Sequence, residues 1–493
     1  MTTTKQKDAP AAARESLGSR LGFLLLSAGC AIGLGNVWRF PFITGKYGGA
    51  VFLIAYLLFL ALMGLPVLIM EFAVGRASGL NMGGALRALE PSVRVDAYFD
   101  WEDRSKPKYE RTYWDNFGWL TIVGCYCLMM FYIPVAGWMV NYMYKGFAGT
   151  LMAPAGTEDV AGYVGGLFGA TLANPANMAF WAVLTSAAGF GVCALGVQRG
   201  VERVTKFMMA GLLVIMVGLA VYALTLPGSG AGLSFYLKPD FARAQAAGFG
   251  ALVNDAMNQA FFTLSIGIGS MCIFGSYLKK DRTLTSESAI IVGLDTFVAL
   301  TAGLIIFPAC FAFGVNPGAG PGLIFVTLPN VFNSMGPTAG RFFGALFFIF
   351  MAAAALTTVI AVVENCIAYF MDTFGWTRRR STLFNFVLLT LLTLPCVLGF
   401  NAWSSFQVPR IGGVLDCEDF LVSNNLLPLG SLLFCLFCTR RYGWGWKNFT
   451  AEADAGRGLR FPQFLRFYLT WVLPVLLVAV FIIGYWQKFG PQP

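Results

Sequence analysis

The chain contains no histidine among its 493 residues. This absence excludes serine–histidine–aspartate catalysis and metal sites that need imidazole ligands. Charged residues are also scarce, at 12% of the chain, whereas soluble proteins carry about 25%. Hydrophobic residues make up 57%. The composition therefore indicates a membrane protein with many spans. For such a chain, length says little about the number of domains.

The cysteines are not expected to form a metal or redox centre. Most of the 11 cysteines lie inside apolar runs. The pairs Cys125–Cys127 and Cys435–Cys438 have suggestive spacing but no nearby partners, so we interpret them as small packing residues. No cleavable signal peptide is expected, because residues 1–16 are polar and the following apolar run is too long and too rich in glycine.

The chain is rich in long apolar runs. A membrane-spanning helix needs about 20 apolar residues. Eleven candidate spans lie at 20–43, 50–74, 117–146, 176–197, 202–226, 252–278, 287–313, 340–371, 383–400, 418–439 and 463–485. These runs predict an all-α polytopic membrane protein.

The loop charges predict the orientation of the spans. With a cytoplasmic N-terminus, the inside loops hold the basic groups at 199–206, 279–282, 378–380 and 440–447. The segment 314–339, which falls outside, has no Lys or Arg. This pattern follows the positive-inside rule and explains the net charge of +9 without a nucleic-acid partner. We expect a plasma-membrane protein in a lipid bilayer, with its C-terminus outside the cell.

One inside loop, at 92–116, mixes acids and bases densely. This mixture favours a solvated loop or a short interfacial helix, and a regulatory contact is the alternative.

Two spans are interrupted by paired glycines. Span one carries Gly33 and Gly35, and span six carries Gly267 and Gly269. Each glycine costs about 1 kcal/mol relative to alanine in a helix. Spans one and six each open a group of five, and broken helices at matching positions of two halves are typical of transporter sites. Since five is odd, the second group enters from the opposite side, and we predict an inverted five-helix repeat (spans 1–5 and 6–10) plus an eleventh span.

This repeat divides the chain into five predicted parts. They are a cytoplasmic segment (1–16), the first repeat (17–226), an extracellular loop (227–250), the second repeat (251–440), and a loop with the last span (441–493).

A helix broken inside a bilayer must satisfy its free backbone groups. The free amides at 33–35 suit an anion such as a carboxylate, and the free carbonyls at 29–32 are hard oxygen donors for a small cation. Together they predict a site for an amino acid with sodium. The alternative is that the glycines only let helices pack closely; Asn36 and Arg39, which follow directly, favour the functional interpretation.

Ionisable residues within spans are functional by default. Asp295 is the candidate for cation binding. Glu71 and Glu364 have two open interpretations, direct chemistry or satisfaction of unwound backbone amides. The adjacent Thr357 and Thr358 either bond back to their own helix or face a sodium ion.

Several motifs together resemble the neurotransmitter:sodium symporter family, in its bacterial eleven-span amino-acid transporter branch. They lie at 33–41, 70–76, 236–241, 261–265 and 423–430, within a match that covers about 14–440. The resemblance implies a transporter rather than an enzyme. It implies sodium-coupled import of a neutral, hydrophobic amino acid by alternating access, with no organic cofactor.

The resemblance also implies site residues, carried over by position. The first sodium ion would be bound by Ala31, Asn36, Thr263 and Asp295. The second would be bound by Gly29, Ile32, Ala354, Thr357 and Thr358. The substrate would be bound by Ala31, Gly33, Leu34, Gly35, Leu128, Tyr132, Phe262, Thr263, Ser265, Ile268, Thr358 and Val362. The outer gate would consist of Arg39, Asp419 and Phe262, and the inner gate of Arg14 and Asp372, near Ser276 and Tyr277.

The chain departs from the family pattern in three ways. Cys30 replaces an Asn, and Leu17 replaces the usual inner-gate Trp. Asp295 stands where many members have Asn, and Ala299 where chloride-dependent members have Ser. Because a fixed carboxylate supplies the negative charge that chloride otherwise provides, we predict chloride independence.

Other classes fit less well. A channel would need a continuous polar pore, and an enzyme would need a nucleophile with a base. A sensor that binds substrate without moving it stays open as an alternative. The sequence leaves open the choice among leucine, methionine and aromatic cargo, the number of sodium ions, proton counter-movement and the oligomeric state, although a monomer is sufficient.

Overall fold

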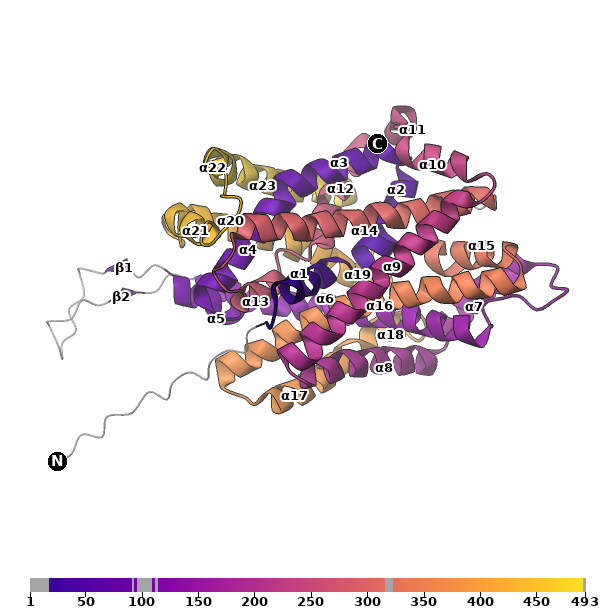
Figure 1. The fold of residues 1–493 in the computed structure, drawn as a ribbon, viewed down its shortest axis with the longest axis horizontal. Coiled ribbons are helices and arrows are strands. Elements are labelled where there is room, and N and C mark those ends of the chain that lie inside the picture. Colours follow the sequence, from indigo (N-terminus) through magenta and orange to yellow (C-terminus); the bar gives the residue numbers. More distant parts are fainter. Residues whose placement is uncertain (1–16, 91–92, 95–108, 111–113, 315–321, 491–493) are drawn as a thin grey trace.

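The structure is a computed structural model that describes residues 17–90, 93–94, 109–110, 114–314 and 322–490. Apolar helices make up almost all of these residues. A two-stranded antiparallel pair, β1 (Val93–Arg94) and β2 (Tyr109–Glu110), falls within the charged loop. The rest of that loop lies outside the described residues. The helices form one elongated bundle (Figure 1).

The first half of the bundle follows the predicted spans. Its helices and π-helical turns are α1 (Arg20–Ala31), η1 (Gly35–Arg39), α2 (Phe40–Lys46), α3 (Ala50–Phe59), η2 (Leu60–Gly64), α4 (Leu65–Ser78), α5 (Met82–Leu89), α6 (Trp114–Ala148), α7 (Val160–Ala173), α8 (Pro175–Ala194), η3 (Val197–Glu202) and α9 (Arg203–Thr225).

The second half opens with two short helices. Its elements are α10 (Ser229–Leu237), α11 (Phe241–Ala246), α12 (Phe249–Thr263), α13 (Ser270–Ser276), α14 (Leu284–Ala312), η4 (Leu323–Thr327), α15 (Leu328–Ser334), α16 (Pro337–Phe374), α17 (Arg378–Leu392), α18 (Leu394–Gly399), α19 (Val414–Leu421), η5 (Val422–Leu426), α20 (Leu427–Thr439), α21 (Trp446–Ala453), α22 (Leu465–Phe467), η6 (Tyr468–Val472) and α23 (Leu473–Phe489).

Nine uninterrupted helical segments of the described chain are long and apolar enough to span a membrane. A tenth span is the bent pair Arg20–Ala31 and Gly35–Lys46. The place of the predicted sixth span is taken by α12 and α13, which are separate helices. The segment 314–339, predicted as a loop, contains η4 and α15 instead, because its apolar run from Leu323 is long enough to form a buried helix.

The first break occurs where the glycines predict it. Helix α1 ends at Ala31, Ile32 takes an extended conformation with φ −75° and ψ 91°, and the chain turns by 50° before Gly35. A Cβ atom at Gly33 would collide with the Tyr132 and Thr358 hydroxyls. Glycine is therefore required here for close approach, in addition to loosening the helix.

The second break lies between α12 and α13. Ser265, Gly267 and Gly269 have φ values of 51°, 94° and 69°, in the left-handed region that glycine adopts without strain. A Cβ at Gly267 would also collide with the Leu427 carbonyl of α20. This break therefore depends on glycine for its backbone conformation and for its packing.

Glu71 satisfies the freed backbone of the second break. Its carboxylate is fully buried and accepts hydrogen bonds from the Gly267 amide at 2.5 Å and the Met271 amide at 3.2 Å. Of the two interpretations left open by the sequence, this geometry supports the second one. Glu71 stabilises unwound peptide from a neighbouring helix, α4.

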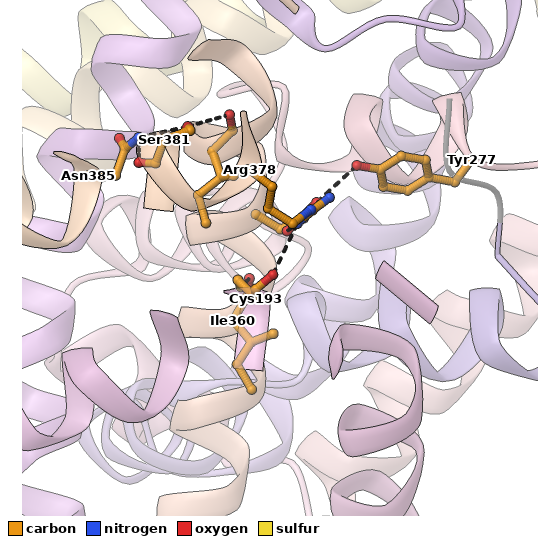
Figure 2. A network of polar contacts seen from close by, with 8 residues as sticks. Cys193, Tyr277, Ile360, Arg378, Ser381 and Asn385 are labelled. Atoms are coloured by element: carbon orange, nitrogen blue, oxygen red, sulfur yellow. Dashed lines mark hydrogen bonds and ion pairs between the residues drawn. The ribbon is translucent and has the colours of Figure 1, made fainter. Parts of the chain in front are cut away.

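Glu364 has a different partner, and of its two open interpretations the structure does not support satisfaction of unwound amides. Its carboxylate makes a two-pronged ion pair with the Arg378 guanidinium, at 2.8 and 2.9 Å. It also accepts a hydrogen bond from the Tyr277 hydroxyl at 3.1 Å. Figure 2 shows Arg378 reaching between Tyr277 and the Cys193 carbonyl. The network ties the end of α13 to α16, α17 and α8.

Replacing Glu71 by alanine should destabilise the protein by about 3 kcal/mol, because two buried amides would lose their acceptor. The measurement is thermal unfolding in detergent, followed with a thiol-reactive dye that reports exposure of the buried cysteines. Glu71→Gln is the control, since it keeps the volume and one acceptor oxygen and should lose less. An unchanged unfolding midpoint for Glu71→Ala would contradict this role.

Candidate ion and substrate site

The two helix breaks meet at the centre of the bundle and share hydrogen bonds. The Ser265 hydroxyl from the second break donates to the Cys30 carbonyl beside the first, at 3.3 Å. The Gln259 side-chain amide of α12 donates to the Gly35 carbonyl at 2.8 Å. Gln259 was missed by the sequence reasoning, although a buried amide one turn before a predicted break is a usable signal.

The amides of the first break face side-chain oxygens. The Leu34 amide donates to the Tyr132 hydroxyl at 3.0 Å, and the Gly33 amide to the Asn36 side-chain oxygen at 3.3 Å. These contacts place Tyr132, a candidate from span three, directly at the first break.

A small cavity lies between the breaks. Its volume is about 10 Å³, which is room for about one water molecule. The lining residues are Cys30, Ala31, Gly33, Gly35, Leu128, Tyr132, Phe262, Ser265, Thr358 and Leu427. No lining side chain is charged. The walls must move apart before the cavity can hold an amino acid.

Eight of the twelve predicted substrate residues line this cavity, whereas Leu34, Thr263, Ile268 and Val362 do not. Ile268 and Val362 are buried, and their place in the substrate wall stays a prediction. The Ile268 carbonyl accepts a hydrogen bond from the Cys125 thiol of α6 at 3.5 Å. Leu427 takes part in the wall instead. No local sequence signal identifies it, since the contact between Gly267 and α20 brings it there.

Asp295 gathers polar groups from three other segments. Its buried carboxylate accepts hydrogen bonds from the Asn36 side-chain amide at 2.8 Å and the Thr263 hydroxyl at 3.1 Å. The Tyr56 hydroxyl lies 3.4 Å away. Within the described chain, no lysine or arginine pairs with this carboxylate. A buried carboxylate of this kind suits a bound cation, because an unpaired buried charge is costly.

The residues predicted for the first sodium ion are therefore largely together. Asn36, Thr263 and Asp295 are in direct contact, and Ala31 lines the adjoining cavity. Tyr56 of α3 is an additional neighbour that the sequence reasoning missed. This tyrosine lies in an apolar run that carries no local signal of a binding site.

A second group of oxygens lies where α16 passes α1. The Thr358 hydroxyl lies 3.2 Å from the Gly29 carbonyl and 3.5 Å from the Ala354 carbonyl. The Thr357 hydroxyl donates back to the Ala354 carbonyl at 2.9 Å. Thr357 therefore bonds within its own helix, whereas Thr358 reaches α1. A sodium ion facing these hydroxyls stays a prediction. The Ile32 amide donates to the Ala28 carbonyl at 2.6 Å.

On one side the cavity is closed by a basic and an acidic residue. The Arg39 guanidinium lies 3.6 Å from the Asp419 carboxylate, and the Ser423 hydroxyl links the two at 2.8 and 2.6 Å. The same guanidinium lies over the Phe262 ring, 4.6 Å from its centroid. The predicted outer-gate residues are thus in contact with one another, and Phe262 also lines the cavity.

On the other side, the predicted inner gate is described only in part. Arg14 lies outside the described residues. Asp372 accepts hydrogen bonds from the Asn81 amide at 3.1 Å and its side chain at 2.6 Å. Tyr277 contacts Glu364, as described above, while Leu17 is buried beside a hollow of about 280 Å³ at the start of α1. Nearby, the Ser276 hydroxyl bonds within its own turn.

Known proteins resemble this chain over nearly its whole length. A sodium-dependent transporter of Bacillus subtilis, YhdH, is 33% identical over 473 residues, which cover 94% of this chain and 96% of that protein. The sodium-dependent serotonin transporter of Drosophila melanogaster is 26% identical over 97% of this chain and 78% of its own length.

A solved structure shares the fold. The crystal structure of MhsT in complex with L-phenylalanine superposes with a TM-score of 0.82 and 35% identity, covering 96% of this chain and 100% of MhsT. This similarity confirms the predicted all-helical architecture with its broken first helix in each half.

The description of the matching family model is "Sodium:neurotransmitter symporter family", and the match covers residues 14–100 and 168–491. Since these residues make up most of the chain and the relatives align with nearly all of it, this protein belongs to the sodium:neurotransmitter symporter family, a family of sodium-dependent membrane transporters.

Proposed function

We propose that this protein imports a neutral, hydrophobic amino acid together with sodium. The observation that carries the proposal is the buried Asp295 carboxylate, which lies where the two helix breaks meet. It contacts Asn36 beside the first break and Thr263 at the second. A cation bound there would lie next to the cavity that receives the amino acid.

Two sodium positions fit the oxygen donors. The first uses the side chains of Asn36, Thr263 and Asp295 with the Ala31 carbonyl. The second uses the carbonyls of Gly29, Ile32 and Ala354 with the hydroxyls of Thr357 and Thr358. Both sets offer hard oxygen ligands from different helices, so either position couples ion binding to the packing of α1 against its neighbours.

The proposed substrate orientation follows from the polar groups at the first break. Its carboxylate would receive hydrogen bonds from the Leu34 and Gly35 amides and from Tyr132, while its amine would face backbone carbonyls near Thr263. The apolar wall, with Leu128, Phe262 and Leu427, would hold the side chain. The complex of the related MhsT with L-phenylalanine supports a hydrophobic substrate. A charged side chain would find no counter-ion in this lining.

The sodium gradient is large enough to drive such transport. Each cation moved inward gains about 2.3 kcal/mol per 100 mV of membrane potential. A tenfold sodium gradient adds about 1.4 kcal/mol per ion. Two ions then supply roughly 7 kcal/mol, which would support about a 10⁵-fold substrate gradient.

The proposed orientation places the N-terminus in the cytoplasm. The start of the described chain, α5 and α21 lie toward one end of the bundle, and α7 and α15 toward the other (Figure 1). The inside loops of the prediction meet at the first of these ends. Its high content of arginine and lysine supports a cytoplasmic position in a plasma membrane.

The direct experiment is uptake into proteoliposomes. Radiolabelled leucine, methionine and phenylalanine are tested with an inward sodium gradient and with sodium equal on both sides. We expect uptake above equilibrium only with the gradient. Binding of an amino acid without any gradient-driven uptake would support a sensor and contradict the proposal.

Asp295→Ala should abolish sodium-dependent amino-acid binding, because it removes the one carboxylate from the first ion position. Scintillation proximity binding across a sodium titration measures this effect. The matched control is Asp255→Ala, which removes an acid that pairs with Lys46 away from the cavity. The control should bind normally, and both variants should keep the cooperative unfolding of the wild type. Normal sodium dependence in Asp295→Ala would refute the assigned site.

Transport should not depend on chloride. Asp295 supplies a fixed negative charge beside the proposed ion, and Ala299 follows one helical turn later, where it is fully buried and has no hydroxyl to offer an anion. The initial rate of sodium-driven uptake should therefore be similar in chloride and in gluconate buffer. A strict requirement for chloride would show that the charge balance has been assigned incorrectly.

A further inference from the structure

A hollow far from the central cavity lies between the end of α20 and the start of the last span. Its volume is about 600 Å³. Three arginines and three aromatic residues dominate its lining: Arg440, Arg441, Arg466, Tyr442, Phe467 and Trp471. We call this group the basic hollow. It takes no part in the proposed sodium or substrate positions.

The positive charge of the basic hollow is not neutralised by the described part of the chain. No acid there forms an ion pair with any of the three arginines. The Arg440 Nε atom and the Thr470 hydroxyl are buried, yet neither has a hydrogen-bond partner among the described residues. Buried donors without acceptors are costly. An anionic ligand with several oxygens would satisfy them.

The hollow is held in shape by its surroundings. The Arg440 guanidinium lies over the Trp471 ring, 3.9 Å from its centroid. The turn after Arg440 is fixed by Trp114, whose ring nitrogen donates to the Tyr442 carbonyl at 2.8 Å and whose ring stacks on that of Tyr442. The Arg440 guanidinium therefore requires little reorganisation before it binds a ligand.

The open side of the hollow would face the lipid bilayer. Phe467 is 70% exposed and Trp471 is 55% exposed. Both begin the last span, whose later apolar side chains Val475 and Ile482 are also exposed. Aromatic residues at the end of a span typically lie at the level of lipid headgroups. In Figure 1, α20, α21 and α22 lie at the same end of the bundle as α5, which is the proposed cytoplasmic end.

We propose that the basic hollow binds the phosphate headgroup of an anionic phospholipid of the inner leaflet. The three guanidinium groups would bind the phosphate oxygens, and the acyl chains would lie along the exposed face of α23. Basic pockets between spans on the cytoplasmic side bind headgroups of this kind. Free phosphate shares the headgroup chemistry, but the aromatic rim and the apolar face of α23 favour a lipid.

The test uses the purified full chain reconstituted with equal amounts of phosphatidylglycerol and phosphatidylcholine. The protein is then extracted in mild detergent, and its retained lipid is identified by native mass spectrometry. The test variant is Arg441→Gln/Arg466→Gln, which leaves the packed Arg440 in place. The control, Arg457→Gln/Arg460→Gln, removes two exposed charges outside the hollow. Thermal unfolding without added lipid checks that both variants fold.

The wild type and the control should retain phosphatidylglycerol in preference to phosphatidylcholine. The test variant should retain it about 30-fold less, since each basic side chain near an anionic lipid contributes roughly fivefold. Equal loss in both variants, or no preference in the wild type, would overturn the proposal. The proposal would also be overturned if inorganic phosphate stabilised the wild-type protein against unfolding as much as phosphatidylglycerol does. The ligand would then be the free anion. None of these readouts depends on transport, so failure of the proposed function would leave this test unaffected.

Discussion

Unwound peptide inside a bilayer has no water to satisfy its free N–H and C=O groups, and the rest of this structure follows from that constraint. The two broken spans leave such groups at the centre of the protein. Side chains of other helices satisfy them: Glu71 accepts from the second break, and Tyr132 accepts from the first. Gln259 and Thr358 donate to carbonyls around the first break. The breaks are therefore stable because neighbouring helices bind them.

The same contacts explain why a ligand would change the structure. The central cavity has a volume of about 10 Å³. An amino acid can therefore bind only if it replaces the contacts between protein side chains and the backbone with contacts of its own. Tyr132 is bonded to the Leu34 amide, where the substrate carboxylate is proposed to bind. The pair of Arg39 and Asp419 closes one side of the cavity through Phe262. Opening that side would separate residues of η1 and α19.

The sequence was sufficient for features that depend on local composition. Apolar run length located the spans, and the glycine pairs located both breaks. Asp295 was recognisable because an acidic side chain inside a membrane span is costly and therefore indicates a functional role. Where contacts between distant segments decide the outcome, the sequence was insufficient. Tyr56 and Leu427 reach the site through packing of helices that no local pattern encodes.

The same limit applies where the sequence left a choice open. Glu364 had two open interpretations, and its partner Arg378 lies at the start of the next helix, where the sequence shows only a run of basic residues. Ile268 was carried over to the pocket wall by position, and this stays a prediction, since the residue is buried but is not among those that line the small cavity. A motif fixes which residues stand near a site, and backbone conformation decides which of them face it.

The central claim is that one pair of broken helices binds the amino acid and sodium as neighbours. If so, each ligand must strengthen the binding of the other by the same factor. The most direct measurement is a pair of titrations on the purified protein: leucine affinity at several sodium concentrations, and sodium affinity at several leucine concentrations. The account predicts equal increases in the two affinities. A leucine affinity that does not change with sodium would contradict it.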